Sequence, residues 1–148
     1  MRTDRDAVLD LLARFAHGID GRDWELYRSV FTDEIDVDYT SYRPGSRARM
    51  PADEWVGRAR RLFPGLDATQ HVLVNPWLQA DGGDVRVRTS MRADHFLGGE
   101  RYSLGGTYEH GVVRDGEDWR IAAVTLTVTW TEGDRELLVR GAERAGGR

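Results

Sequence analysis

The chain has 148 residues, a length that suits one domain built around one hydrophobic core. Hydrophobic residues make up 40% and charged residues 31%, as in a soluble globular protein, and a net charge of −4 argues against a general nucleic-acid surface. The sequence has no cysteine, which excludes disulfides, thiolate metal ligands and cysteine nucleophiles. All 21 basic residues are arginine, so a Schiff-base lysine is excluded as well.

No part of the sequence indicates a membrane or export segment. The apolar runs are much shorter than the roughly 20 residues that a spanning helix needs. The opening "MRTDRDAVLD" carries acidic residues and no long apolar stretch, so it does not resemble a signal peptide. We therefore expect a cytoplasmic protein with one domain over residues 1–148, and a flexible, frayed tail at 141–148.

The first predicted element is a helix from about Asp4 to Ile19, capped by Thr3 or Asp4. Its apolar residues recur at steps of three and four, which places one stripe against a core; they are Val8, Leu11, Leu12, Phe15 and Ile19. On this helix Asp20 emerges at the end, close to the buried face.

A second helix is predicted from "RDWELYRSVF" (22–31), with Trp24, Tyr27 and Phe31 on its inner side. Residues 34–42 alternate and are rich in β-formers, which predicts a strand. A loop at 43–49 then leads to a third helix over 51–63, with Pro51 in its first turn.

The second half of the chain predicts four long antiparallel strands. Turn sequences stand at 81–84 ("DGGD"), 97–100 ("LGGE") and 115–118 ("DGED"). The strand between the first two turns alternates between an apolar face and an arginine-rich face, which indicates one covered and one wetter side. The last strand spans about 119–130, and "GDRELLVRGAE" closes the chain as a short helix.

This order of elements predicts an α+β fold. Three N-terminal helices pack on the concave face of a curved, cone-shaped antiparallel or mixed sheet. The open end of such a cone is a natural pocket for a small molecule.

Four segments carry a resemblance to a known family: "LLARFAHGIDGRDWELYRSVFTDEIDVDYTSY", "TQHVLVN", "RADHF" and "GGTYEHGVVRDGEDWRI". Over roughly residues 4–140 the chain resembles the SnoaL-like branch of the nuclear transport factor 2-like superfamily. That superfamily includes dehydratases, isomerases, polyketide cyclases and proteins without catalysis, so the resemblance is more specific for fold than for function.

The nearest pattern is that of scytalone dehydratase and related dehydratases and dehydrochlorinases. The resemblance implies a catalytic aspartate at Asp20 in "GIDGRDW" and a catalytic histidine at His71 in "TQH". It also implies catalytic roles for Tyr39 in "DVDYTSY" and His95 in "RADHF". Two positions depart from that pattern: Ile19 stands in place of a tyrosine, and Tyr108 in place of an asparagine. The substrate is therefore not transferable.

These residue types suit proton abstraction. A carboxylate bound to one imidazole nitrogen fixes the tautomer and makes the other nitrogen a base, able to take a proton from carbon beside a carbonyl. His95 would act as an acid on a leaving hydroxyl or position a water, and Tyr39 would stabilise an enolate. The competing interpretation is structural: a buried Asp–His bond that pins a helix to the sheet, a core histidine and a packed tyrosine.

Further residues are predicted to bind substrate: Trp24, Tyr108, Phe63 and Met91. Together they point to a flat, hydrophobic, oxygenated small molecule. No cofactor is expected, because no GxGxxG follows a strand. No metal is expected either, because each of the three strand histidines stands alone, without an HxH or HxxxH pair.

The leading hypothesis is a cofactor-independent lyase of the dehydratase type. Two alternatives stay open: an isomerase or polyketide cyclase of secondary metabolism with the same dyad, and a non-catalytic binding or assembly module. By resemblance we expect a homodimer or homotrimer, and no nucleic-acid or membrane partner. An enclosed pocket, with Asp20 and His71 in hydrogen-bond reach, would favour the enzyme.

Overall fold

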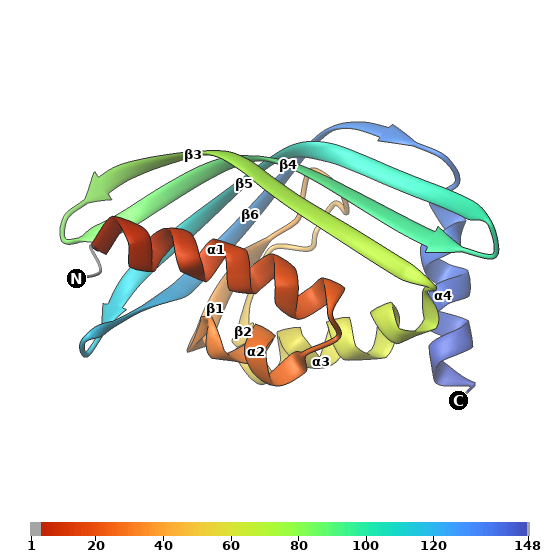
Figure 1. Ribbon diagram of the computed structural model, residues 1–148, viewed down its shortest axis with the longest axis horizontal. Helices are drawn as coiled ribbons and strands as arrows, with labels where there is room; N and C mark the ends of the chain where they lie inside the picture. Colours follow the sequence, from red (N-terminus) through yellow and green to blue (C-terminus); the bar gives the residue numbers. More distant parts are fainter. Residues whose placement is uncertain (1–3, 148) are drawn as a thin grey trace.

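The computed structural model describes residues 4–147 and confirms the α+β class. Figure 1 labels the elements along the chain. They are α1 (Asp4–Asp20), α2 (Trp24–Ser29), β1 (Phe31–Asp38), β2 (Ala48–Pro51), α3 (Ala52–Leu62), the 3₁₀ turn η1 (Phe63–Gly65), β3 (Ala68–Asp81), β4 (Asp84–Leu97), β5 (Glu100–Asp115), β6 (Asp118–Glu132) and α4 (Glu136–Gly146).

Helix α1 forms as its spacing predicts. Its apolar stripe is buried against the sheet, and Phe15 at its centre is fully covered. The helix runs on to Asp20 and ends there, where Gly21 and Arg22 turn the chain. Thr3, the alternative cap, lies outside the described residues.

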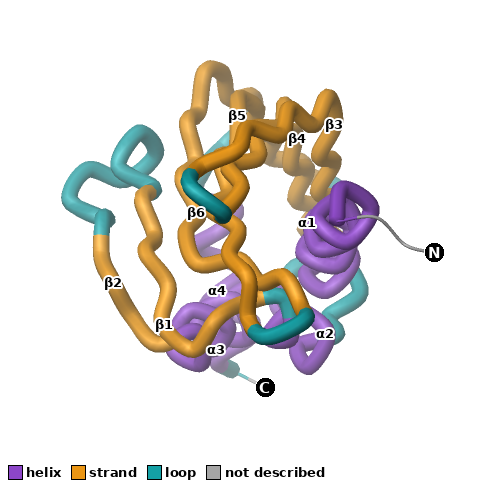
Figure 2. The backbone as a smooth tube through the Cα atoms, turned by 90° about the vertical axis from the view of Figure 1, so that its left-hand side faces the viewer, coloured by secondary structure: helices purple, strands orange, loops and turns teal. Residues whose placement is uncertain are grey.

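The sheet has six strands in the order β2-β1-β6-β5-β4-β3. The long strands β3 to β6 are consecutive antiparallel neighbours, joined at the three predicted turns. Strand β1 pairs parallel to β6 and antiparallel to β2, so the sheet is mixed. Figure 2 shows the strands curving from β2 at the left over the top to β3, with α1 at the right and α2 and α3 below.

The predictions for residues 22–51 need correction. Helix α2 ends at Ser29, because Phe31 already pairs with β6. The strand expected over 34–42 is shifted to Phe31–Asp38, and Tyr39 lies in the turn that follows. The loop expected at 43–49 gives way to β2, and Pro51 precedes α3 in an extended conformation (ψ 138°). These boundaries depend on pairing with distant strands, which local pattern does not report.

The C-terminal segment is more ordered than its glycines indicate. The predicted closing helix is present as α4, but it extends to Gly146 and includes most of the tail expected to be frayed. Gly65 and Gly141 are buried where α4 crosses η1, and a methyl group on Gly65 would lie 1.7 Å from the Gly141 carbonyl oxygen. Paired glycines here permit close packing rather than flexibility. None of the described helices is long and apolar enough to cross a membrane.

Candidate active site

The end of α1 brings Asp20 against strand β3. One carboxylate oxygen, Oδ1, lies 2.7 Å from Nδ1 of His71, and the other, Oδ2, accepts the His71 backbone N–H at 2.7 Å. An ionised carboxylate can only accept, so Nδ1 carries the proton and Nε2 keeps its lone pair. Both Asp20 oxygens are thus used to hold one imidazole in one tautomer and one orientation.

Two further side chains hold the carboxylate in place. Thr69, which shares the inner face of β3 with His71, donates its hydroxyl to Asp20 Oδ1 at 3.0 Å. The guanidinium of Arg22 donates to the Thr69 hydroxyl at 2.8 Å and to the Ile19 carbonyl at 2.9 Å. Arg22 reaches them from a left-handed backbone conformation (φ 54°), which is uncommon outside glycine.

The hydrogen bonds keep Asp20 charged. Burial by itself favours the neutral acid, but the hydrogen bonds and charge of His71 outweigh it, with help from Thr69, and the net effect lowers the pKa of Asp20. At neutral pH the carboxylate is therefore available to orient His71 and to stabilise it when it takes a proton.

His95 and Phe63 lie beside this dyad. The rings of His71 and His95 are 5.8 Å apart, and Phe63 contacts both, edge-on to His71 and stacked on His95. His95 Nδ1 donates to the Tyr102 carbonyl at 3.1 Å. Burial, followed by the nearby His71, lowers the pKa of His95 to about 4. At neutral pH His95 is therefore uncharged, and its Nε2 is an acceptor rather than an acid.

Tyr39 and Tyr108 form a second polar group within the fold. Their side chains are close enough for each to affect the pKa of the other. Burial raises the pKa of Tyr108 to about 12 and that of Tyr39 well above its usual value, so both stay protonated and able to donate. The charge of Asp20 also acts on Tyr108, which brings this pair within electrostatic range of the dyad.

The remaining predicted binding residues occupy different parts of the interior. Met91 is buried on the inner face of β4, next to Leu73 of β3. Trp24 packs edge-on against Tyr27 with ring centres 6.4 Å apart. Trp55 donates a hydrogen bond to the Tyr27 hydroxyl, and its ring packs edge-on against Tyr39. Trp24 thus joins the aromatic packing near Tyr39, and none of its described ring contacts is to the dyad itself.

A groove of about 360 Å³ lies beside the dyad, between α1 and β3. Asp20 and His71 both line it, so the dyad is in reach of a small molecule. We expected an enclosed pocket, and the hollow is instead partly open, beside β3 at the edge of the sheet.

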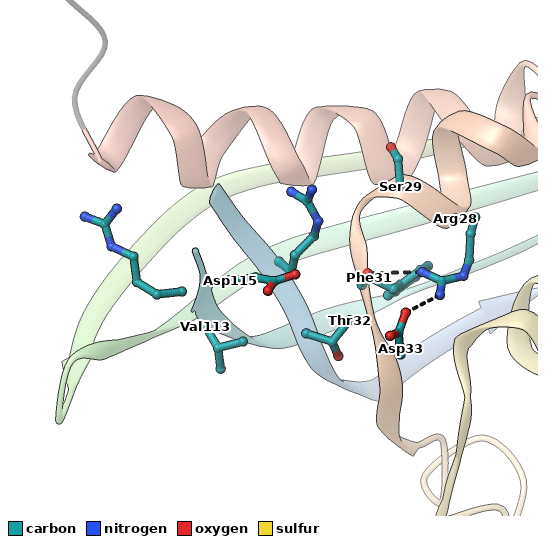
Figure 3. A pocket seen from close by; sticks show the side chains of 9 residues that line it. Arg28, Ser29, Phe31, Thr32, Asp33, Val113 and Asp115 are labelled. Atoms are coloured by element: carbon teal, nitrogen blue, oxygen red, sulfur yellow. Dashed lines mark hydrogen bonds and ion pairs between the residues drawn. The ribbon is translucent and has the colours of Figure 1, made fainter. Parts of the chain in front are cut away.

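A second hollow, of about 420 Å³, lies at the far end of the sheet and holds none of the predicted site residues. Figure 3 shows Arg28 there, bonded to the Phe31 carbonyl and to Asp33. It also pairs with Asp53 at 2.7 Å, so this arginine is already neutralised by the protein. We assign no chemistry to this hollow.

Among residues 4–147, no group of three or more histidine, aspartate or glutamate side chains converges in a way that could hold a metal ion.

Sequence reasoning missed three contributors to the site: Thr69, Arg22 and Tyr102. Thr69 had a usable signal, since it stands two residues before His71 and so shares its face. Arg22 and the Tyr102 carbonyl had none, because their contacts depend on a turn conformation and on the pairing of β4 with β5.

Comparison with known proteins agrees with this architecture. Residues 1–125 match the SnoaL-like domain family. The chain belongs to this family. The solved structure of the Kfla4162 protein from Kribbella flavida superposes on this SnoaL-like domain with a TM-score of 0.82, at 25% identity over 97% of both chains.

Among curated proteins, this SnoaL-like domain is similar to fungal dehydratases. Dehydratase cfoI of Aspergillus candidus is 30% identical over 161 aligned positions, which cover 97% of this chain and 92% of that protein. The scytalone dehydratase-like protein claB of Passalora fulva is 24% identical over 135 positions, covering 81% and 82%. The domain is thus a distant relative of dehydratases with the nuclear transport factor 2-like fold.

Proposed function

We propose that this SnoaL-like domain is a cofactor-independent lyase of the dehydratase type. The observation that carries the proposal is the 2.7 Å contact between Asp20 and Nδ1 of His71, with the second Asp20 oxygen on the His71 backbone N–H. This arrangement leaves Nε2 as a directed base. The distant relationship to fungal dehydratases supports the same class of reaction.

The proposed substrate is a small hydrophobic molecule with a carbonyl and a hydroxyl group on the β carbon. His71 Nε2 takes the proton from the carbon beside the carbonyl, and the C–H electrons enter the new C=C bond. The C–O bond on the neighbouring carbon breaks, and the hydroxide leaves with the proton returned by His71, as water. Asp20 stabilises the imidazolium between these two proton transfers.

The residues beside the dyad are proposed to hold the leaving group and the substrate carbonyl. His95 is neutral, with Nδ1 tied to the Tyr102 carbonyl, so its Nε2 accepts a hydrogen bond and holds the departing hydroxyl or water. Tyr39 and Tyr108 stay protonated, and Tyr39 donates to the substrate carbonyl as charge develops on its oxygen. Phe63 contacts both histidines and provides an apolar surface beside them.

Proton abstraction can be tested without the natural substrate. We expect the protein to accelerate exchange of the α-protons of 2-tetralone in deuterated water, followed by NMR. His71→Ala should bring exchange down to the uncatalysed rate, and Asp20→Asn should reduce it by about 10²–10⁴-fold, the range of general-base catalysis. Asp84→Asn, at an exposed carboxylate at the start of β4, is the matched control and should exchange as the wild type does. Wild-type exchange in His71→Ala would refute the assignment.

A second assay separates the lyase from its alternatives. A panel of β-hydroxy ketones is incubated with the protein, and the products are analysed by mass spectrometry. Loss of one water supports the lyase. A product of unchanged mass, with α-proton exchange retained, identifies an isomerase or cyclase. No exchange and no product on any ketone would favour a binding or assembly module.

A further inference from the structure

The groove between α1 and β3 extends well beyond the dyad. Asp20 and His71 line it together with residues from both elements. The other lining residues are Leu9, Leu12, Ala13, Ala16 and His17 of α1, Gln70, Val72, Leu73 and Pro76 of β3, and Thr89 of β4.

Its shape is long rather than compact. Helix α1 runs antiparallel to β3 beneath the edge of the sheet, as Figure 1 shows. The lining residues of α1 extend from Leu9 to Asp20, which at about 1.5 Å per residue spans about 16 Å. A narrow hollow of this length, with the dyad at one end, suits a chain rather than a ring.

The lining changes in character along the groove. At the dyad end it is polar, with Asp20, His17 and Gln70. Away from the dyad it is formed by aliphatic side chains and proline, including Leu9, Leu12, Leu73 and Pro76, and carries no charged group. An apolar group is favoured there because it removes these side chains from water.

One polar atom interrupts the apolar part. Thr89 is 1% exposed, and its buried hydroxyl has no hydrogen-bond partner among residues 4–147. A buried hydroxyl without a partner is unfavourable, so its presence points to a group that completes it.

Strand β3 is irregular next to this hydroxyl. The register with β4 shifts between Val74 and Trp77, so Thr89 has no partner residue on β3. Asn75 within the bulge has a left-handed backbone (φ 56°). Bulges of this kind bend an edge strand and are frequent beside binding sites.

We propose that the groove binds an extended apolar chain of the substrate, bearing a carbonyl or hydroxyl oxygen that pairs with Thr89. This inference rests on the proposed function, because it names the substrate class of the same site: aliphatic-chain ketones whose reacting carbon lies at the dyad. The chain lies between α1 and the bulged part of β3, and Thr89 sets its depth through one hydrogen bond.

The test is the binding of 2-decanone to the full-length protein, followed by amide NMR shifts. We expect saturable shifts along α1 and β3. Thr89→Val should weaken binding about fivefold, the measure of one neutral hydrogen bond, and Thr89→Ser should restore it. Equal affinity in the wild type and Thr89→Val, or shifts confined to another surface, would overturn the proposal.

A larger side chain that fills the groove provides an independent test of the proposal. Ala16→Phe should weaken binding of 2-decanone at least tenfold. Ala142→Phe, at an exposed position on α4, is its control and should bind as the wild type does. Unaltered binding in a folded Ala16→Phe protein would contradict the proposal. Binding needs no turnover, so a groove that binds the ketone in a protein without α-proton exchange refutes only the lyase. Exchange that depends on His71, without ketone binding, refutes only the groove.

Discussion

His71 and His110 both lie within the fold on the inner face of the same sheet, yet only one has a partner. His71 Nδ1 is bound to Asp20 at 2.7 Å, and its backbone is held by the same carboxylate. Both ring nitrogens of His110 are buried without a partner, and its ring packs against Phe15 and Tyr108 at 4.9 and 5.2 Å. Burial lowers the pKa of His110 to about 3.

The comparison of His71 with His110 shows that burial alone makes a histidine a neutral core residue. A carboxylate at one nitrogen is what turns a buried imidazole into a directed base. His95 lies between the two cases, with a carbonyl at Nδ1 and a pKa of about 4. At one end of the sheet the histidine is hydrogen-bonded to a carboxylate, and at the other it packs among aromatic rings.

The largest expected effect comes from disturbing the dyad end without touching its polar residues. Gly65→Ala places a methyl group 1.7 Å from the Gly141 carbonyl oxygen, so α4 and η1 must move apart and Phe63 with them. We expect a loss of about 3 kcal/mol in the free energy of unfolding, measured by urea titration. The change should also slow α-proton exchange, since Phe63 contacts both His71 and His95.

Gly57→Ala is the control for this substitution. It lies within α3 and would meet only the flexible end of Arg61, at 3.3 Å. Alanine favours a helix over glycine by about 1 kcal/mol, so stability should hold or rise. If both variants lost the same free energy of unfolding, the close packing of α4 on η1 would not explain the effect of Gly65→Ala.

The buried His110 should make the free energy of unfolding fall as the pH is lowered. Above pH 6.5 His110 is neutral in both folded and unfolded states. As pH falls from about 6.5 towards about 3, the unfolded chain binds a proton that the folded chain excludes. Each such histidine therefore removes about 1.4 kcal/mol of stability per pH unit. His110→Leu should reduce the slope by that amount, without loss of stability at pH 7. An unchanged slope in urea titrations between pH 5 and about 6.5 would contradict this account.

A smaller effect should follow from loosening the support of the dyad. Thr69→Val keeps the shape of the side chain but removes the hydroxyl that joins Asp20 to Arg22. We expect a loss of about 1 kcal/mol in stability and about a fivefold slower α-proton exchange. Exchange at the wild-type rate would mean that the two Asp20–His71 hydrogen bonds alone hold the carboxylate.

A substitution on the outer face of the same sheet should leave α-proton exchange unchanged. It exposes large apolar side chains beside Arg86, Arg88 and Arg92, and we propose that copies of the chain associate through it. The exposed apolar residues outside the groove are Val74, Trp77, Phe96 and Trp130. Trp77, at 58% exposed, is the natural position to test. Native mass spectrometry should show a dimer or trimer for the wild type and a monomer for Trp77→Glu, with unchanged α-proton exchange. A monomeric wild type would refute the association.

Much of the fold follows from local pattern. The apolar stripe of α1, the alternation in the long strands and the three turns between them are properties of residues close in sequence, and all appear where expected. The boundaries of β1 and β2 do not, because the parallel pairing of β1 with β6 has no local signal. The packing of α4 is similar, since Gly65 and Gly141 reveal their role only when their segments meet.

For the site, the sequence by itself determined that His71, His95 and His110 each stand alone on a different long strand, because strand pattern is local. It also placed Asp20 at the buried end of a helix, and a resemblance paired it with His71. Only the tertiary structure decided which histidine has a carboxylate. Asp20 and His71 are 51 residues apart, and their contact depends on how α1 packs across the sheet. The Arg22 turn, the Tyr102 carbonyl at His95 and the lack of a polar partner for His110 among the described residues are likewise products of packing. Each depends on atoms that local pattern cannot bring together.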